Sequence, residues 1–108
     1  MFNYEIHINY GDAGQFDQLQ EIITLDLVKD TVDQIRLEIM AKSQFLIDMG
    51  RPFVIKAFFK NPTLRVEIPY ATRGRDFHVV NAEDLDSAIN RIEWDFNERT
   101  QIFKLLND

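Results

Sequence analysis

The stretch HVVNAEDLDSAINRI, residues 78–92, predicts the end of a strand, a helix cap and an amphipathic helix in direct succession. Asn81 is one of the residue types that cap helices best, because its side-chain oxygen accepts a hydrogen bond from a backbone N–H of the first turn. Glu83 and Asp84 place negative charge in that turn, where the helix dipole favours it. We therefore predict a helix over residues 82–98. The apolar residues that follow at the spacing of one helical face are Leu85, Ile89, Ile92 and Phe96.

Three stretches before this helix alternate apolar and polar residues, which is the period of a half-buried strand. They lie at residues 4–10, 53–59 and 64–68. A β-branched stretch at 21–28 predicts a strand that pairs back on the first. Residues 76–80 predict a short strand ahead of the last helix.

An earlier helix is expected over residues 31–48. Asp30 is predicted to cap it, and Asp33 adds negative charge to its first turn. Gly50 is a common stop residue and sets the expected end. The stripe expected to face the core consists of Val32, Ile35, Ile39 and Leu46, with Met40 and Ile47 at its edge.

The expected element order is β-β-α-β-β-β-α, which packs a mostly antiparallel sheet against helices and defines an α+β fold. With 108 residues, 45% of them hydrophobic, the chain is expected to form a single compact domain over residues 1–108. The last helix either continues to residue 106 or breaks near residues 98–100.

Charge is sorted into blocks along the chain, which carries a net charge of -6 from 12 basic and 18 acidic residues. Residues 1–50 hold nine acids and three bases, residues 51–80 hold two acids and six bases, and residues 81–108 hold seven acids and three bases. An acidic protein with a basic middle can present two patches that orient a partner. The alternative is that these charges only solvate the surface.

The chain has no cysteine, so it offers neither a disulfide nor a thiolate metal site. Residues 1–10 lack the basic and apolar regions of a secretory signal. No stretch is apolar over the ~18 residues that a membrane span needs. We therefore expect a cytoplasmic protein with no membrane contact.

Two stretches of the chain resemble a known family. Residues 23–42, ITLDLVKDTVDQIRLEIMAK, run from a strand through a short acidic turn into a helix, as in a ubiquitin-like β-grasp. LRVEI at 64–68 and then FHVVNAEDLDSAINRI at 77–92 resemble the close of a PB1 domain, the β-grasp adaptor module. The resemblance implies a β-grasp fold and a role in protein–protein interaction. The positions that match the cap and acidic pair of PB1 domains are Asn81, Glu83, Asp84, Leu85 and Ala88.

The chain departs from the way in which PB1 domains pair, where an acidic loop on one domain meets a lysine on the first strand of another. Residues 4–10 contain no Lys or Arg, and the loop where acids should cluster carries Arg73 and Arg75. The acids that remain for such a face are Asp76, Glu83, Asp84 and Asp86.

His7 and His78 are the two histidines of the chain, and both are expected on strands, facing away from the core. With Glu5 or Asp76 they are a weak metal or acid–base candidate, because two distant histidines carry no metal-site spacing. No phosphate-binding loop, dinucleotide-binding fingerprint or hydrolase motif is present. We expect no catalysis, no metal and no cofactor.

Nucleic acid is not the expected partner. The acidic total repels a phosphate backbone everywhere except near the basic residues, among them Arg73 and Arg75.

Apolar residues also occur on helix faces that point away from the expected core. Leu37, Ala41 and Phe45 recur at intervals of four, and Trp94 and Leu105 lie opposite the stripe of the last helix. Neighbouring loops or the C-terminal tail could cover them. The alternative is a surface for a partner, since Trp and Phe are favoured anchors of interfaces.

We therefore expect a non-catalytic protein–protein interaction module with segregated acidic and basic surfaces, whose partner is another protein or a second copy in a homodimer. The alternative is a small acidic inhibitor of the phage or mobile-element type that blocks a host nucleic-acid enzyme. The predicted partner-binding residues are Leu37, Phe45, Trp94, Arg73, Arg75, Glu83, Asp84 and Asp86.

Overall fold

The computed structural model describes residues 3–11, 16, 18–27, 29–61, 66–67 and 75–107. This part of the chain forms five strands and two helices. In chain order they are β1 (Asn3–Tyr10), β2 (Gln18–Asp26), α1 (Asp33–Asp48), β3 (Phe53–Asn61), β4 (Val66–Glu67), β5 (Arg75–Val79) and α3 (Ala82–Asn107).

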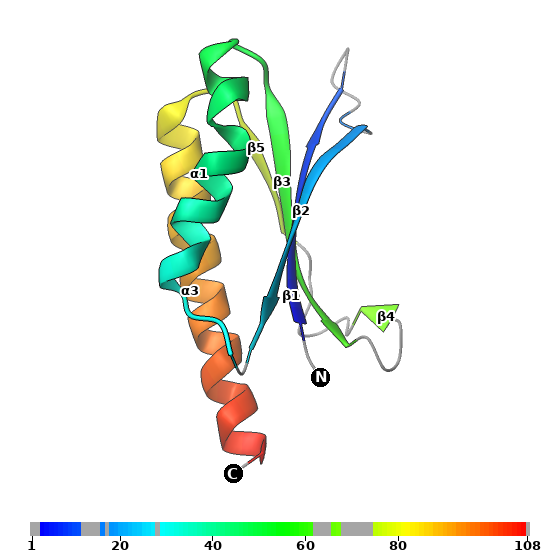
Figure 1. The fold of residues 1–108 in the computed structure, drawn as a ribbon, viewed down its shortest axis with the longest axis vertical. Coiled ribbons are helices and arrows are strands. Elements are labelled where there is room, and N and C mark those ends of the chain that lie inside the picture. Colours follow the sequence, from blue (N-terminus) through cyan, green and yellow to red (C-terminus); the bar gives the residue numbers. More distant parts are fainter. Residues whose placement is uncertain are drawn as a thin grey trace.

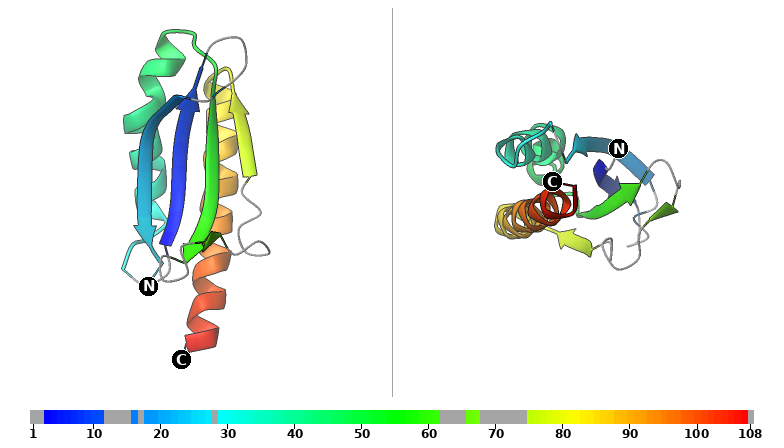
Figure 2. Two further views of the ribbon diagram at one scale, coloured as in Figure 1. Left: turned by 90° about the vertical axis from the view of Figure 1, so that its right-hand side faces the viewer. Right: turned by 90° about the horizontal axis from the view of Figure 1, so that it is seen from below.

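The strands form one sheet, and both helices cover the same face of it (Figure 1). The strand order is β2-β1-β3-β4, and β5 also pairs with β3. Every pairing is antiparallel. Seen from below, the two helices make one layer and the strands the other (Figure 2). The predicted α+β class, with its antiparallel sheet and two helices, is confirmed.

This topology does not confirm the β-grasp that the family resemblance implied. β1 lies between β2 and β3, and its ladder with β3 runs antiparallel over the whole of Asn3–Tyr10. The last strand, β5, pairs with β3 alongside Phe53–Ala57.

The core lies between the sheet and the two helices. Tyr4 ties β1 to α3, because its ring stands edge-on to that of Phe96 at 5.7 Å and its hydroxyl donates a 2.7 Å hydrogen bond to Asp95. Removing each large aliphatic side chain from water contributes roughly 1.5–3 kcal/mol. The alternation of β1 and the two helical stripes are buried as predicted: Tyr4, Ile6, Ile8, Ile35, Ile39, Leu46, Leu85, Ile89, Ile92 and Phe96.

α3 begins as the sequence predicts. The Asn81 side-chain oxygen accepts a 2.8 Å hydrogen bond from the Asp84 backbone N–H, and the Asp84 carboxylate accepts one of 3.1 Å from the Val80 N–H. The helix then continues to Asn107 without a break at residues 98–100, so it extends past the end of the sheet (Figure 1).

α1 begins later than predicted, and the cap predicted at Asp30 is wrong. Val32 occupies the N-cap position and makes no side-chain cap hydrogen bond. Asp30 instead closes the turn after β2. Its carboxylate accepts a 2.7 Å hydrogen bond from the Asp26 N–H, and its own N–H donates one of 2.9 Å to the Asp26 carbonyl. A carboxylate engaged in that turn is not available to the helix.

The predicted stop of α1 at Gly50 is confirmed. Gly50 has φ of +66°, and its N–H donates to the Ile47 carbonyl while the Arg51 N–H donates to the Leu46 carbonyl. These two bonds satisfy carbonyls that the end of a helix leaves unpaired, and the left-handed conformation they need favours glycine.

Two predicted strand ranges differ from the structure. β2 spans Gln18–Asp26 instead of 21–28, because its hairpin ladder with β1 extends back to Tyr10, with a register shift between Ile8 and Asn9. Of the strand predicted at 64–68, β4 covers Val66–Glu67, and the other residues lie outside the described part of the chain.

Candidate functional site

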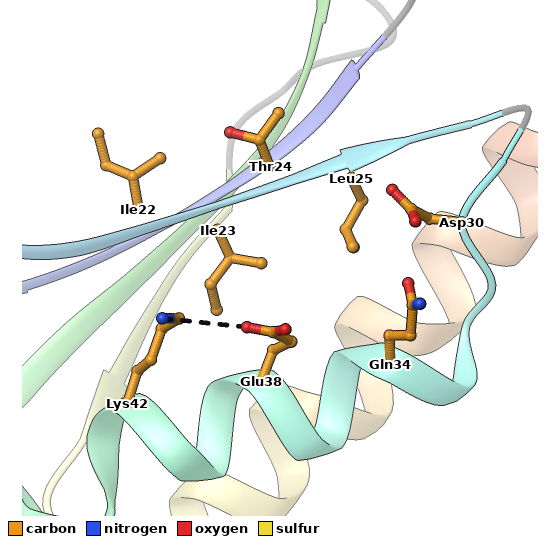
Figure 3. Close-up of a pocket in the computed structure, with 8 residues that line it drawn as sticks. All are labelled: Ile22, Ile23, Thr24, Leu25, Asp30, Gln34, Glu38 and Lys42. Atoms are coloured by element: carbon orange, nitrogen blue, oxygen red, sulfur yellow. Dashed lines mark ion pairs between the residues drawn. The ribbon is translucent and has the colours of Figure 1, made fainter.

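A groove of about 280 Å³ separates β2 from α1 at one edge of the sheet (Figure 3). Ile23 and Leu25 point from β2 toward α1, whereas Ile22 and Thr24 point to the other side of the strand (Figure 3). The groove is lined by Ile22, Ile23, Thr24 and Leu25 of β2, by Asp30, and by Gln34, Glu38 and Lys42 of α1. Ile23 and Leu25 are almost fully buried beneath the groove, and the surface that it exposes is mostly polar.

The ion pairs beside the groove are weak. Lys42 Nζ lies 3.9 Å from a Glu21 carboxylate oxygen on β2 and 4.0 Å from one of Glu38, one turn earlier on α1. All three side chains keep substantial contact with solvent. Solvated pairs of this kind contribute about 0–1 kcal/mol, so they do not hold the groove closed.

The outer edge of β2 has no partner strand among the residues that the structure describes. Backbone N–H and C=O groups of successive residues in a strand point alternately to its two edges. The N–H of Asp26 donates a hydrogen bond to the Asp30 carboxylate, and its C=O accepts one from the Asp30 N–H, both outside the sheet. The corresponding groups of Thr24 and Ile22, two and four residues earlier, therefore point to the same outer edge. β2 contains neither Lys nor Pro, two residue types that protect edge strands from pairing.

The helix flank beside this edge exposes Phe45. Phe45 follows Glu38 by seven residues and Lys42 by three, so these three lie on one side of α1, whereas Leu37 lies opposite the buried Ile35 and Ile39 and points away from the sheet. Leu37 is 75% exposed and Phe45 is 42% exposed. The predicted exposure of these side chains is thus confirmed. We refer to Glu38, Lys42 and Phe45 as the open flank of α1.

The opposite flank of α1 packs against α3 and is closed by Arg36. Its guanidinium donates hydrogen bonds of 2.6 Å to Asp86, 2.7 Å to Asn90 and 3.3 Å to Glu93. The planar fork of an arginine suits several acceptors at once. The hydrogen bond to Asp86, together with the nearby charge of Glu93, raises the pKa of Arg36.

The acids predicted to bind a partner lie in the first turns of α3. Asp84 takes part in the helix cap, and Asp86 holds Arg36. Glu83 is exposed. Two of the three acids therefore make hydrogen bonds within the protein. The contact of Asp86 could not be predicted from the sequence, because Arg36 lies 50 residues away.

Of the other predicted partner-binding residues, Leu37 and Trp94 do not lie on the open flank. Trp94 is 57% exposed, as expected, but it lies on α3, and α3 packs against the closed flank of α1. The open flank therefore points away from Trp94. Arg75 begins β5, opposite Ala57 of β3, and its side chain is not among those described. Arg73 lies outside the described residues.

The histidines lie on the face of the sheet opposite the helices. His7 Nε2 is hydrogen-bonded to Glu5 at 2.9 Å, and its ring stands edge-on to Phe58 at 4.8 Å. His78, on β5, has its ring 5.6 Å from that of Phe16. Among the described residues, no three His, Asp or Glu side chains gather in a way that could hold a metal.

Two features of this region were not predicted from the sequence. The exposure of Ile22 could have been predicted, because it is an apolar residue out of phase with the buried Ile23 and Leu25. Nothing in the sequence around Arg36 marks its contacts with α3.

Comparisons of the chain with protein-family models, with curated proteins and with solved structures find no match. Within the described residues, neither helix combines the length and the apolar character needed to cross a bilayer.

Proposed function

We propose that this protein is a non-catalytic protein–protein interaction module that binds through the outer edge of β2 and the open flank of α1. One observation carries the proposal: a strand edge with outward backbone groups and a helix flank with exposed Phe45 lie on the same side of the molecule. Soluble monomers usually protect such edges, and they rarely expose large apolar patches. A partner would cover both.

The shape of the site supports the addition of a strand to the sheet. An extended segment placed along β2 would pair with the outward N–H and C=O groups of Ile22 and Thr24. Successive side chains of a strand point to opposite faces, so every second one would enter the groove beside α1. Main-chain hydrogen bonds would then supply affinity, and the groove would supply selectivity.

Charge would orient such a partner. Three of the 18 acidic residues lie in α1 and six in α3, so the helical layer holds half of the acids. Lys56 lies on β3, next to His7 in the register of β1 and β3, on the face opposite the helices. Complementary charge on a partner mainly raises the association rate and fixes the orientation.

The proposal is tested by capture on the immobilised protein, with the chain itself and an extract of its native host offered in turn. We expect the wild type to retain a specific protein and the variant Phe45→Asp to lose it while keeping the wild-type circular dichroism spectrum. Trp94→Asp is the matched control, because it places the same charge at an exposed apolar position on the other helix. Equal retention by Phe45→Asp and the wild type would exclude the open flank as the binding surface.

A further inference from the structure

We infer that the segment added to β2 is a basic stretch of another protein, with Lys or Arg at the alternate positions that face α1. This inference rests on the proposed function and names the chemistry of the partner that the same surface takes. The charge of the groove between β2 and α1 carries it, because that charge disfavours acidic side chains at the same positions.

The helical wall of the groove is a row of side chains with oxygen acceptors. Asp30, Gln34, Glu38 and Lys42 follow one another along it, opposite β2 (Figure 3). Gln34 thus stands between two carboxylates. Of the described residues that line the groove, Lys42 alone carries a positive charge, and it lies at one end of the row.

The negative charge of this site exceeds the positive charge. Lys42 is shared between two carboxylates, Glu21 at 3.9 Å and Glu38 at 4.0 Å. With Asp30, three carboxylates therefore surround one ammonium group. Lys29 belongs to the same turn as Asp30, but it is exposed and does not line the groove. A further cation between Asp30 and Glu38 would balance the charge.

The two carboxylates of the wall keep acceptor positions for a partner. The Asp30 carboxylate accepts a hydrogen bond from the Asp26 N–H, and a carboxylate has sites for about four. The Glu38 side chain is 48% exposed, and its 4.0 Å contact with Lys42 is longer than a hydrogen bond. An ammonium or guanidinium group can therefore donate to both without breaking the hydrogen bond that closes the turn.

The spacing along the wall matches that of an added strand. Gln34 and Glu38 are four residues apart on α1, which is about 6 Å along the helix axis. Side chains on one face of a strand are two residues apart, or roughly 6.6–6.8 Å. α1 runs alongside β2, so two successive groove-facing side chains reach Glu38 and the pair Gln34 and Asp30 (Figure 3). Long basic side chains suit these places, because their stems can cross the strand edge while their charged ends stay hydrated.

The same wall selects between strands. The outward N–H and C=O groups of Ile22 and Thr24 would pair with any extended segment, so they supply affinity without preference. Glu or Asp at the groove-facing positions would meet Asp30 and Glu38, and like charges across an interface oppose binding. The wall therefore favours a basic segment.

The first test titrates the intact protein, labelled with nitrogen-15, with two synthetic peptides of equal length. One alternates Thr with Arg, and the other alternates Thr with Glu. We expect the Arg peptide to shift the backbone amide signals of Ile22 and Thr24, and to bind more weakly at 1 M than at 0.1 M salt because charges are then screened. The Glu peptide should leave both signals in place. Equal shifts with the two peptides would overturn the inference, since the groove would not distinguish their charge.

The second test removes one carboxylate of the wall. Glu38→Gln keeps the shape of the side chain, and we expect it to raise the dissociation constant of the Arg peptide about two- to fivefold, the range of a solvated ion pair. Glu83→Gln is the matched control, because Glu83 is exposed on α3 and does not line the groove. This control should leave the constant unchanged. Equal weakening in both variants would mean that the peptide responds to the overall charge, which also overturns the inference.

The outcomes separate this inference from the proposed function. The peptides could leave Ile22 and Thr24 unmoved while the immobilised protein still captures a host protein that Phe45→Asp loses. That result overturns the basic segment and leaves the interaction module standing. Unmoved signals together with a wild type that captures nothing contradict both.

Discussion

The two flanks of α1 differ in the contacts that their side chains make. On the closed flank, Arg36 spans the gap to α3 with three hydrogen bonds of 2.6–3.3 Å to Asp86, Asn90 and Glu93. On the open flank, the ion pairs of Lys42 are 3.9–4.0 Å long, and Phe45 faces solvent beside a strand edge. One flank of α1 is thus fixed to α3, whereas the other keeps its contact with solvent.

The largest effect should come from the residues beneath both flanks. Ile39 is fully buried between α1 and the sheet, so Ile39→Ala loses buried surface and leaves a cavity. We expect it to lower the free energy of unfolding by about 2–5 kcal/mol, measured by urea denaturation. Leu37→Ala, two residues away on the exposed side of α1, should change the free energy of unfolding by less than about 0.5 kcal/mol. Similar losses at both positions would show that Leu37 belongs to the core.

Arg36→Ala should have an intermediate effect, because it removes the closure between α1 and α3. We expect a loss of roughly 1 kcal/mol in the free energy of unfolding, since the ion pairs are partly exposed but the network joins three acceptors. Arg91→Ala removes an exposed arginine elsewhere on α3 and is the matched control. If the two variants unfold at the same urea concentration, the hydrogen bonds of Arg36 do not stabilise the helix pair.

The sequence predicted those parts of the fold that depend on neighbouring residues. The cap at Asn81, the stop at Gly50 and the buried alternation of Tyr4, Ile6 and Ile8 are all set by local pattern, and all are confirmed. A residue type that caps helices can equally close a turn with its carboxylate. The cap expected at Asp30 failed for this reason.

The parts that could not be predicted depend on contacts between distant segments. The sequence does not state the strand order, so it could not show that β2 is an edge strand or that Ile22 has outward backbone groups. It also could not show that Asp86 is held by Arg36. The exposed side of α1 was predicted from helical spacing alone, because a stripe opposite the core stripe must face away from the sheet.

The smallest effect should come from Lys42, and it tests whether the open flank is open. Lys42→Gln is best made in the Phe45→Asp background, where binding through the open flank no longer contributes to stability. We expect a change of less than about 0.5 kcal/mol in the free energy of unfolding, because both ion pairs of Lys42 are long and solvated. The change should shrink further between 0.1 M and 1 M salt, as the Debye length falls from about 10 Å to about 3 Å. The free energy of unfolding could instead fall as much as in Arg36→Ala and stay low at 1 M salt. Lys42 would then hold α1 against β2 in the way that Arg36 holds α1 against α3. The groove would then be closed in the monomer, and a partner strand would have to displace Lys42 before it could pair with β2.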